Sequence, residues 1–183
     1  MLTWAHIHLM LNHIPVIGIG VVIAFLLAGR ARGSRELEWV SLQMFVALAL
    51  LTIPVYFTGS PASHQMRDFP GVARETIQRH SSAADFAFAT VEALGALSLG
   101  ALVRFRSPAA VPARLTTALL ALALTALGLM IWTANLGGRI RHPEIGASNT
   151  VPRYGTLLLP IVKVLQETPS HVRLQTLHEG YYS

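Results

Sequence analysis

The sequence contains no cysteine, and few of its residues carry a charge. The absence of cysteine excludes disulfides, iron–sulfur clusters, zinc–thiolate sites and covalently attached c-type haem. Charged residues make up 13% of the 183 residues, whereas an ordinary soluble domain has about 25%. Apolar residues reach 52%. This composition indicates an integral membrane protein of a length that suits one domain.

No basic residue precedes Arg30. A secretory signal peptide begins with a positively charged region and ends at a cleavage site flanked by small residues. Here the apolar run comes first, so we expect the N-terminal segment to be retained as a membrane span. The net charge of +5 comes from arginines near the ends of apolar runs, without interleaved aromatic residues. We therefore expect no nucleic-acid partner.

Four apolar runs are each long enough to cross the ~30 Å hydrocarbon core of a bilayer. They predict an all-α, integral membrane four-helix bundle over residues 1–146, followed by a tail over 147–183 that could hold a short interfacial helix. The expected spans are residues 4–28, 37–57, 81–103 and 115–136. We expect Pro15 to kink the first span just after His13, and Pro54 to break the last turn of the second.

The distribution of basic residues predicts the orientation. Six of the 14 basic residues lie in two short links, which together hold about 18 residues, and the other eight spread over about 70 residues. Segments rich in arginine stay in the cytoplasm. We therefore expect both short links inside, and both termini on the outer, periplasmic side.

Histidines gather at the expected outer ends of the spans. In a regular helix His6 and His13 share one face, and His8 lies roughly 160° away. A histidine in a membrane is costly without a partner, and imidazole is a common ligand of transition metals and haem iron. The alternative is that water and lipid headgroups satisfy these side chains. The residues that converge on the outer face are His6, His8, His13, His64, His80 and His142.

His13 and His80 are the expected first pair of haem ligands, because small residues follow each of them at helical spacing. Such stripes let a flat macrocycle, or simply another helix, approach the backbone closely. The stripes are Gly20, Ala24 and Ala28 after His13, and Ala84, Ala87, Val91 and Gly95 after His80. A second site would use two of His6, His8, His64 and His142, with His8 and His142 preferred. Arg139 and Arg141 would pair with haem propionates or with lipid phosphates.

Asp85 and Glu92 are acids well inside a span, seven residues apart and hence on one helical face. Intramembrane carboxylates mark proton or ion paths, or pair with a neighbouring polar group. We expect Asp85 to be solvated near the surface. We expect Glu92 to be neutral and hydrogen-bonded to Gln43 or Thr52, unless it belongs to a proton path.

Four motifs stand at the four outer span ends. They are His8…Leu11-Asn12-His13-Ile14-Pro15-Val16-Ile17-Gly18, Thr58-Gly59-Ser60-Pro61-Ala62, Gly71-Val72…His80…Ala84 and Asn135-Leu136-Gly137-Gly138…Arg141-His142. Together they resemble a family of small bacterial four-span membrane proteins of unknown function, some of which are suspected of binding haem. The resemblance implies a multi-pass protein of the bacterial inner membrane. The family has acids near the positions of Ser60 and Ser81, so the histidines are the ligand type that this chain shares with it.

The leading hypothesis is a b-type cytochrome or cytochrome-like subunit with one or two non-covalent haem b groups near the periplasmic face. It would pass electrons between a quinone or membrane complex and a periplasmic carrier, within a homo- or hetero-oligomer. We expect an electron-transfer subunit without catalytic residues rather than a stand-alone enzyme. Two alternatives stay open. One is a copper, zinc or iron protein with His6, His8, His13 and His142 around one ion, and the other is a structural or assembly subunit.

Overall fold

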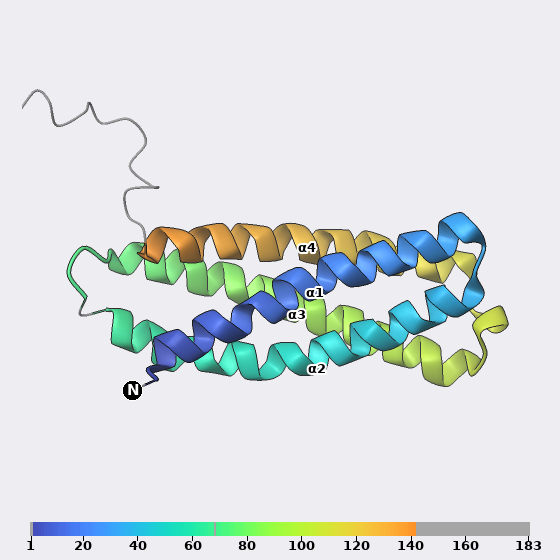
Figure 1. The fold of residues 1–183 in the computed structure, drawn as a ribbon, viewed down its shortest axis with the longest axis horizontal. Helices are drawn as coiled ribbons and strands as arrows, with labels where there is room; N and C mark the ends of the chain where they lie inside the picture. Colours follow the sequence, from blue (N-terminus) through green and yellow to red (C-terminus); the bar gives the residue numbers. More distant parts are fainter. Residues whose placement is uncertain (1, 68, 142–183) are drawn as a thin grey trace, which may run out of the picture. The chain divides into compact units, whose positions relative to one another are not determined.

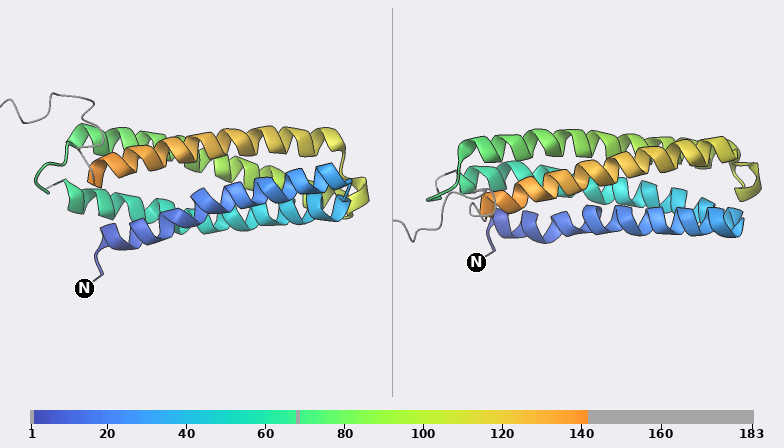
Figure 2. Two further views of the ribbon diagram at one scale, coloured as in Figure 1. Left: turned by 45° about the horizontal axis from the view of Figure 1, so that its top comes forward. Right: turned by 90° about the horizontal axis from the view of Figure 1, so that it is seen from above.

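The computed structural model describes residues 2–67 and 69–141, and these form a bundle of four long helices (Figure 1). The prediction of an all-α four-helix bundle is confirmed for this part of the chain. Consecutive helices run antiparallel, and α1 also packs against α4, which closes the bundle (Figure 2). The elements are α1 (Trp4–Arg32), α2 (Arg35–Met66), α3 (Arg74–Phe105), the short 3-10 helix η1 (Pro108–Ala110) and α4 (Ala113–Arg141).

Two residues make the turn between α1 and α2. Gly33 ends α1 in the left-handed conformation, at a φ of 64°, which glycine adopts without the steric penalty of a side chain. Ser34 then caps α2, because its side chain accepts a hydrogen bond from the backbone N–H of Leu37. The Gly33-Ser34 pair therefore builds a tight helical hairpin.

All four long helices have the length and apolar composition needed to cross a membrane. Large apolar side chains also cover the outside of the bundle, among them Met10 at 68% exposure and Phe57 at 69%. An apolar exterior of this kind suits lipid as the surrounding solvent. The structure is that of a multi-pass membrane protein.

The helices extend beyond the expected spans. With a rise of ~1.5 Å per residue, the 32 residues of α2 or α3 measure about 48 Å, which exceeds the ~30 Å core of a bilayer. The expected break at Pro54 is wrong, because α2 continues through Pro54 and Pro61 to Met66. A membrane helix tolerates proline where neighbouring groups satisfy the freed carbonyl. Helix α1 likewise continues past Pro15.

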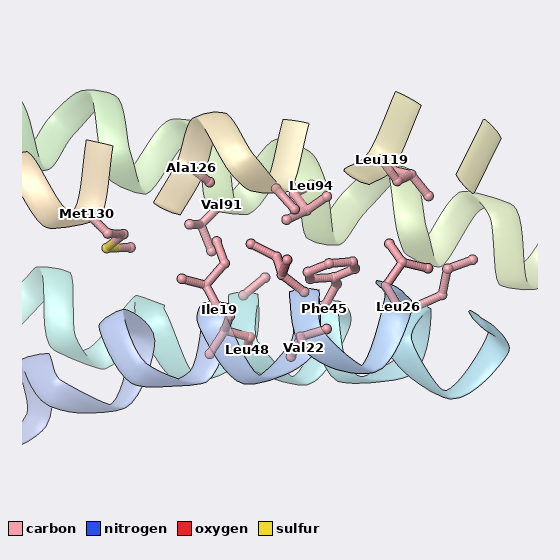
Figure 3. Packing of buried hydrophobic residues seen from close by; sticks show 14 of the residues in the cluster. Ile19, Val22, Leu26, Phe45, Leu48, Val91, Leu94, Leu119, Ala126 and Met130 are labelled. Atoms are coloured by element: carbon pink, nitrogen blue, oxygen red, sulfur yellow. The ribbon is translucent and has the colours of Figure 1, made fainter. Parts of the chain in front are cut away.

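The middle of the bundle is a dry apolar core to which all four helices contribute (Figure 3). In α3 the expected stripe is buried at Ala87, Val91 and Gly95 and partly buried at Ala84. A side chain at Gly95 would collide with Ala49 of α2. In α1 the expected stripe lies outside instead, since Ala24 is exposed and no atom lies within 4 Å of the Cβ that Gly20 lacks. The residues of α1 that are buried in the core instead include Ile19, Val22 and Leu26.

Arginines tie the helices together at the end of the bundle that holds the two short links. Arg30 of α1 donates to the buried hydroxyl of Thr116 on α4, at 2.8 Å. Arg35 forms an ion pair of 3.3 Å with Glu38, which is only 7% exposed, and donates to the carbonyl of Val111. The histidines of the described chain lie toward the other end.

Candidate histidine site

His8 and His80 lie side by side where α1 and α3 begin. Their ring centres are 6.5 Å apart, and their planes are nearly perpendicular at 84°. Both side chains are half-buried. The two residues belong to different hairpins, so the fold brings together two imidazoles that are far apart in the sequence.

The backbone of α2 fixes the protonation of His8. Its Nδ1 lies 3.1 Å from the carbonyl oxygen of Val55 and 3.0 Å from the hydroxyl of Thr58. The Thr58 hydroxyl itself donates to Val55, at 2.7 Å. A carbonyl only accepts hydrogen bonds, so the Nδ1 of His8 must carry the proton. In the neutral ring the Nε2 then keeps its lone pair for a ligand.

The backbone of α4 fixes His80 in the same way. Its Nδ1 donates to the carbonyl of Thr133, at 3.0 Å, and the hydroxyl of Thr133 donates to Leu129 one turn earlier. The Nε2 of neutral His80 is therefore also unprotonated. A hydrogen bond from the remaining ring N–H to a backbone carbonyl is the arrangement that typically orients metal-ligating histidines.

A glycine lies under each imidazole. A Cβ at Gly59 of α2 would approach the Cε1 of His8 to 3.4 Å, and one at Gly137 of α4 would approach the Cε1 of His80 to 3.1 Å. Each hairpin thus repeats one arrangement, in which a histidine of the first helix meets a carbonyl and a glycine of the second. All four long helices contribute to the site.

The separation of the two rings matches an edge-to-face contact between aromatic rings, and it is also close to the separation of two imidazoles that bind one ion. Two imidazoles that bind one metal ion from opposite sides, each through one ring nitrogen with a bond of about 2.0 Å, have ring centres about 6.4 Å apart. Among the described residues, no group of three or more histidine, cysteine, aspartate or glutamate side chains is placed to hold a metal. Two ligands suffice for the axial positions of haem iron, whereas a structural zinc ion takes four protein ligands. The pair of His8 and His80 therefore offers two ligands, which is half of what a structural zinc ion takes.

The other predicted histidines of the described chain point outward. His6 is exposed and lies 2.8 Å from the hydroxyl of Thr3, and His13 is exposed with its Nδ1 2.7 Å from the carbonyl of Leu9 on its own helix. His64 is exposed on α2. The expected split between His8 and the His6–His13 face is present. However, the ring beside His80 is that of His8, in place of the expected His13.

The structure describes the predicted site residues at the end of α4 only in part. Arg139 is exposed, and Arg141 is the last residue of the helix. His142 and the tail over 147–183, with its expected short helix, lie outside the described residues. The second site and the propionate contacts therefore stay predictions.

The acids of α3 differ from what the sequence suggests. Asp85 accepts a hydrogen bond of 2.8 Å from the hydroxyl of Tyr56, a residue that sequence reasoning missed. The sequence could have indicated Tyr56, because an acid at this depth needs a hydrogen-bond donor on the neighbouring antiparallel helix. The expected bond from Glu92 to Gln43 or Thr52 is not formed. The Oε1 atom of Glu92 is buried without a partner, and Thr52 donates to Leu48 instead.

Comparisons with known proteins give no relative for this chain, since no family model, curated protein or solved structure matches it. The resemblance to the four-span family remains an expectation. The function has to be argued from the site alone.

Proposed function

We propose that this chain is an electron-transfer protein of the bacterial inner membrane that binds haem b between His8 and His80. One observation carries the proposal. Two half-buried imidazoles from different hairpins lie 6.5 Å apart, and each has its Nδ1 proton held by a backbone carbonyl. Haem iron bound by two histidines supplies reversible one-electron transfer.

The residues of the chain would set the properties of such a site. The carbonyls of Val55 and Thr133 hold the rings in position and make each Nε2 a stronger donor. His8 and His80 would together supply both protein ligands of the iron, so no position would be left for a substrate. Electron transfer is therefore favoured over catalysis at the metal. Partial burial of the rings among four helices lowers the polarity around them and would contribute to the reduction potential.

The depth of the pair suits exchange with a soluble carrier. Centred on a ~30 Å hydrocarbon core, α1 and α3 would place His8 and His80 close to the boundary with the headgroups. The arginine-rich short links would lie in the cytoplasm, so this boundary would face the periplasm. A periplasmic electron carrier would then reach the site from water.

A two-coordinate copper ion is the second candidate, because it too can be held by two imidazoles without further protein ligands. This alternative keeps the roles of His8 and His80 and changes only the bound group. Copper without haem gives no Soret band, so the two candidates differ in their spectra.

The visible spectrum and the haem content of the purified, full-length protein test the proposal. We expect a Soret band, a sharp α band on reduction and one haem per chain. His8→Ala and His80→Ala should each lose most of the haem, because one axial ligand is removed. The matched control is His13→Ala, which removes an exposed imidazole of α1 and should keep the haem. Wild-type protein without haem, or equal losses in all three variants, would overturn the assignment.

A further inference from the structure

A second group of polar and aromatic side chains lies on the outside of the bundle, between α2 and α3. The hydroxyl of Tyr56 donates to the Oδ1 of Asp85, at 2.8 Å. The ring of Tyr56 stacks on Phe88 with the centres 4.1 Å apart and an angle of 14°, and Phe57 meets Tyr56 edge-on at 5.7 Å. We refer to Tyr56, Phe57, Asp85 and Phe88 as the Tyr56–Asp85 cluster.

The cluster lies below the expected membrane surface. With α3 centred on a ~30 Å core, the boundary falls near His80, and Asp85 lies about 7 Å deeper. Asp85 is nevertheless exposed at the side of the bundle. A carboxyl group that faces lipid is costly, so such residues typically mark a functional site.

No cation neutralises Asp85 among the described residues, where the ion pairs are Arg35–Glu38 and Arg79–Glu75. Tyr56 uses the Oδ1 atom, and the hydrogen bonds of the described chain leave Oδ2 without a donor. The acid thus keeps one acceptor atom on the lipid side. A ligand for this place must be soluble in lipid, carry a hydroxyl group for Asp85 and have a flat ring for the aromatic side chains.

We infer that the Tyr56–Asp85 cluster binds the headgroup of a lipid-soluble hydroquinone, whose electrons pass to the haem between His8 and His80. The electron-transfer half of this inference rests on the proposed function. Asp85 and His80 belong to the same helix, and five residues correspond to a rise of about 7.5 Å. The donor and the acceptor would therefore be neighbours.

The reaction balances with the ferric haem as the oxidant. A hydroquinone loses two protons and two electrons to become a quinone. The Oδ2 of Asp85 would take the proton of the first O–H bond, and the electron would pass to the one-electron acceptor that the proposed haem would supply. Asp85 would then release this proton to the aqueous boundary, and the electron would leave with a periplasmic carrier. The second proton and electron follow the same route.

A second copy of the chain is a weaker candidate for this surface. A symmetric dimer centred on the cluster would bring Asp85 close to its own counterpart, and two carboxyl groups that leave water together are unfavourable. A hydroquinone would instead donate a hydrogen bond from its hydroxyl group to Asp85. The chemistry of the cluster therefore favours the small aromatic ligand.

Two measurements on the full-length protein in lipid nanodiscs test the inference. The first is photolabelling by the reduced, hydroquinone form of an azidoquinone, with the labelled residues mapped by mass spectrometry. We expect the label on α2 near Tyr56 and on α3 near Asp85. The second is the rate of haem reduction by a short-chain ubiquinol, with dithionite as a reductant that needs no binding site.

Asp85→Asn removes the proton acceptor and should slow reduction by ubiquinol on the order of 100-fold, while dithionite still gives the full spectrum. Tyr56→Phe should weaken photolabelling. The matched control is Thr125→Val on α4, an exposed residue whose hydroxyl bonds to its own helix, and it should behave as wild type.

The outcomes separate this inference from the proposed function. Haem-loaded protein that neither takes the label at α2 and α3 nor accepts electrons from ubiquinol overturns the inference alone. Protein without haem that still takes an Asp85-dependent label overturns the proposed function, and it supports the hydroquinone site. Variants that reduce haem at the wild-type rate, or that turn a dimer into a monomer, would overturn the hydroquinone site.

Discussion

The candidate site depends on which nitrogen of each imidazole carries its proton. At His8 and His80 the carbonyls of the neighbouring helices accept a hydrogen bond from the Nδ1–H group. Neither position requires a charged partner for this, so both rings can stay neutral in an apolar environment. A neutral ring with a free Nε2 is the form that binds a metal. The hairpin partner of each histidine is therefore part of the site even though it offers no ligand.

Gly137→Ala tests the contact between α4 and His80. The new Cβ would lie 3.1 Å from the Cε1 and 3.3 Å from the Nδ1 of His80, so the ring has to shift by a few tenths of an ångström. We expect destabilisation of about 1 kcal/mol, as is typical of overpacking, together with an altered α band in the haem-loaded protein. Thermal unfolding and the visible spectrum measure the two effects.

Gly138→Ala is the matched control, because no atom lies within 4 Å of the Cβ that Gly138 lacks. It should unfold at the wild-type temperature or slightly above. Equal behaviour of the two variants would mean that Gly137 does not constrain His80.

Helical periodicity predicted that His8 lies opposite His6 and His13, but not which face turns inward. The buried residues Pro15, Val22 and Gly29 follow His8 at intervals of seven, on the inner face. In a soluble helix the opposite face would be polar and would settle the question. In lipid both faces are apolar, so only packing against the other helices distinguishes them. The histidine of the pair could not be chosen from the sequence for this reason.

At the scale of the elements, α3 is the helix whose packing the sequence predicted best. Its small residues allow the close approach of α2, and Gly95 meets Ala49 at the tightest point. Each expected span lies within one of the four long helices, and each helix continues beyond its span. The thickness of the bilayer limits the length of the apolar run but not the length of the helix. Polar turns outside the core continue with their own hydrogen bonds, so α2 reaches Met66 and α3 begins at Arg74.

Gly95→Ala should separate α2 and α3. A methyl group at this position collides with the Cβ of Ala49, which is attached directly to the backbone of α2 and cannot move without it. We expect a loss of stability of about 1–3 kcal/mol, seen as a lower midpoint of unfolding in detergent.

Gly100→Ala on the same helix provides the comparison, because its missing Cβ has no neighbour within 4 Å. It should be neutral or stabilising by up to about 1 kcal/mol, since alanine is the better helix former. A midpoint for Gly95→Ala as high as that of Gly100→Ala would contradict the close contact.

For the whole molecule, the two ends of the bundle have opposite chemistry. One end holds His8 and His80, which contact no charged side chain of the described residues. The other end holds Arg30 and Arg35 in contacts with Thr116, Glu38 and Val111. The sequence predicted this separation, because antiparallel spans return every second connection to the same end. It did not predict the hydrogen bonds that hold each end together, since these depend on the rotation of each helix.

The predicted orientation rests on the arginines of the two short links, and it decides which compartment the histidines would face. Positively charged links resist translocation across the membrane. At a fusion site after Arg32, a reporter enzyme that works only in the cytoplasm should therefore be active, and one that works only in the periplasm should be inactive. Fusions after Arg106 should give the same result as fusions after Arg32. After Gly71, only the reporter that works in the periplasm should be active. The reversed pattern would place His8 and His80 at the cytoplasmic boundary. A periplasmic carrier would then be excluded as the redox partner, whereas the His8–His80 geometry and its haem test would be unaffected. A mixed pattern, with the two short links on different sides, would contradict the antiparallel four-span bundle itself.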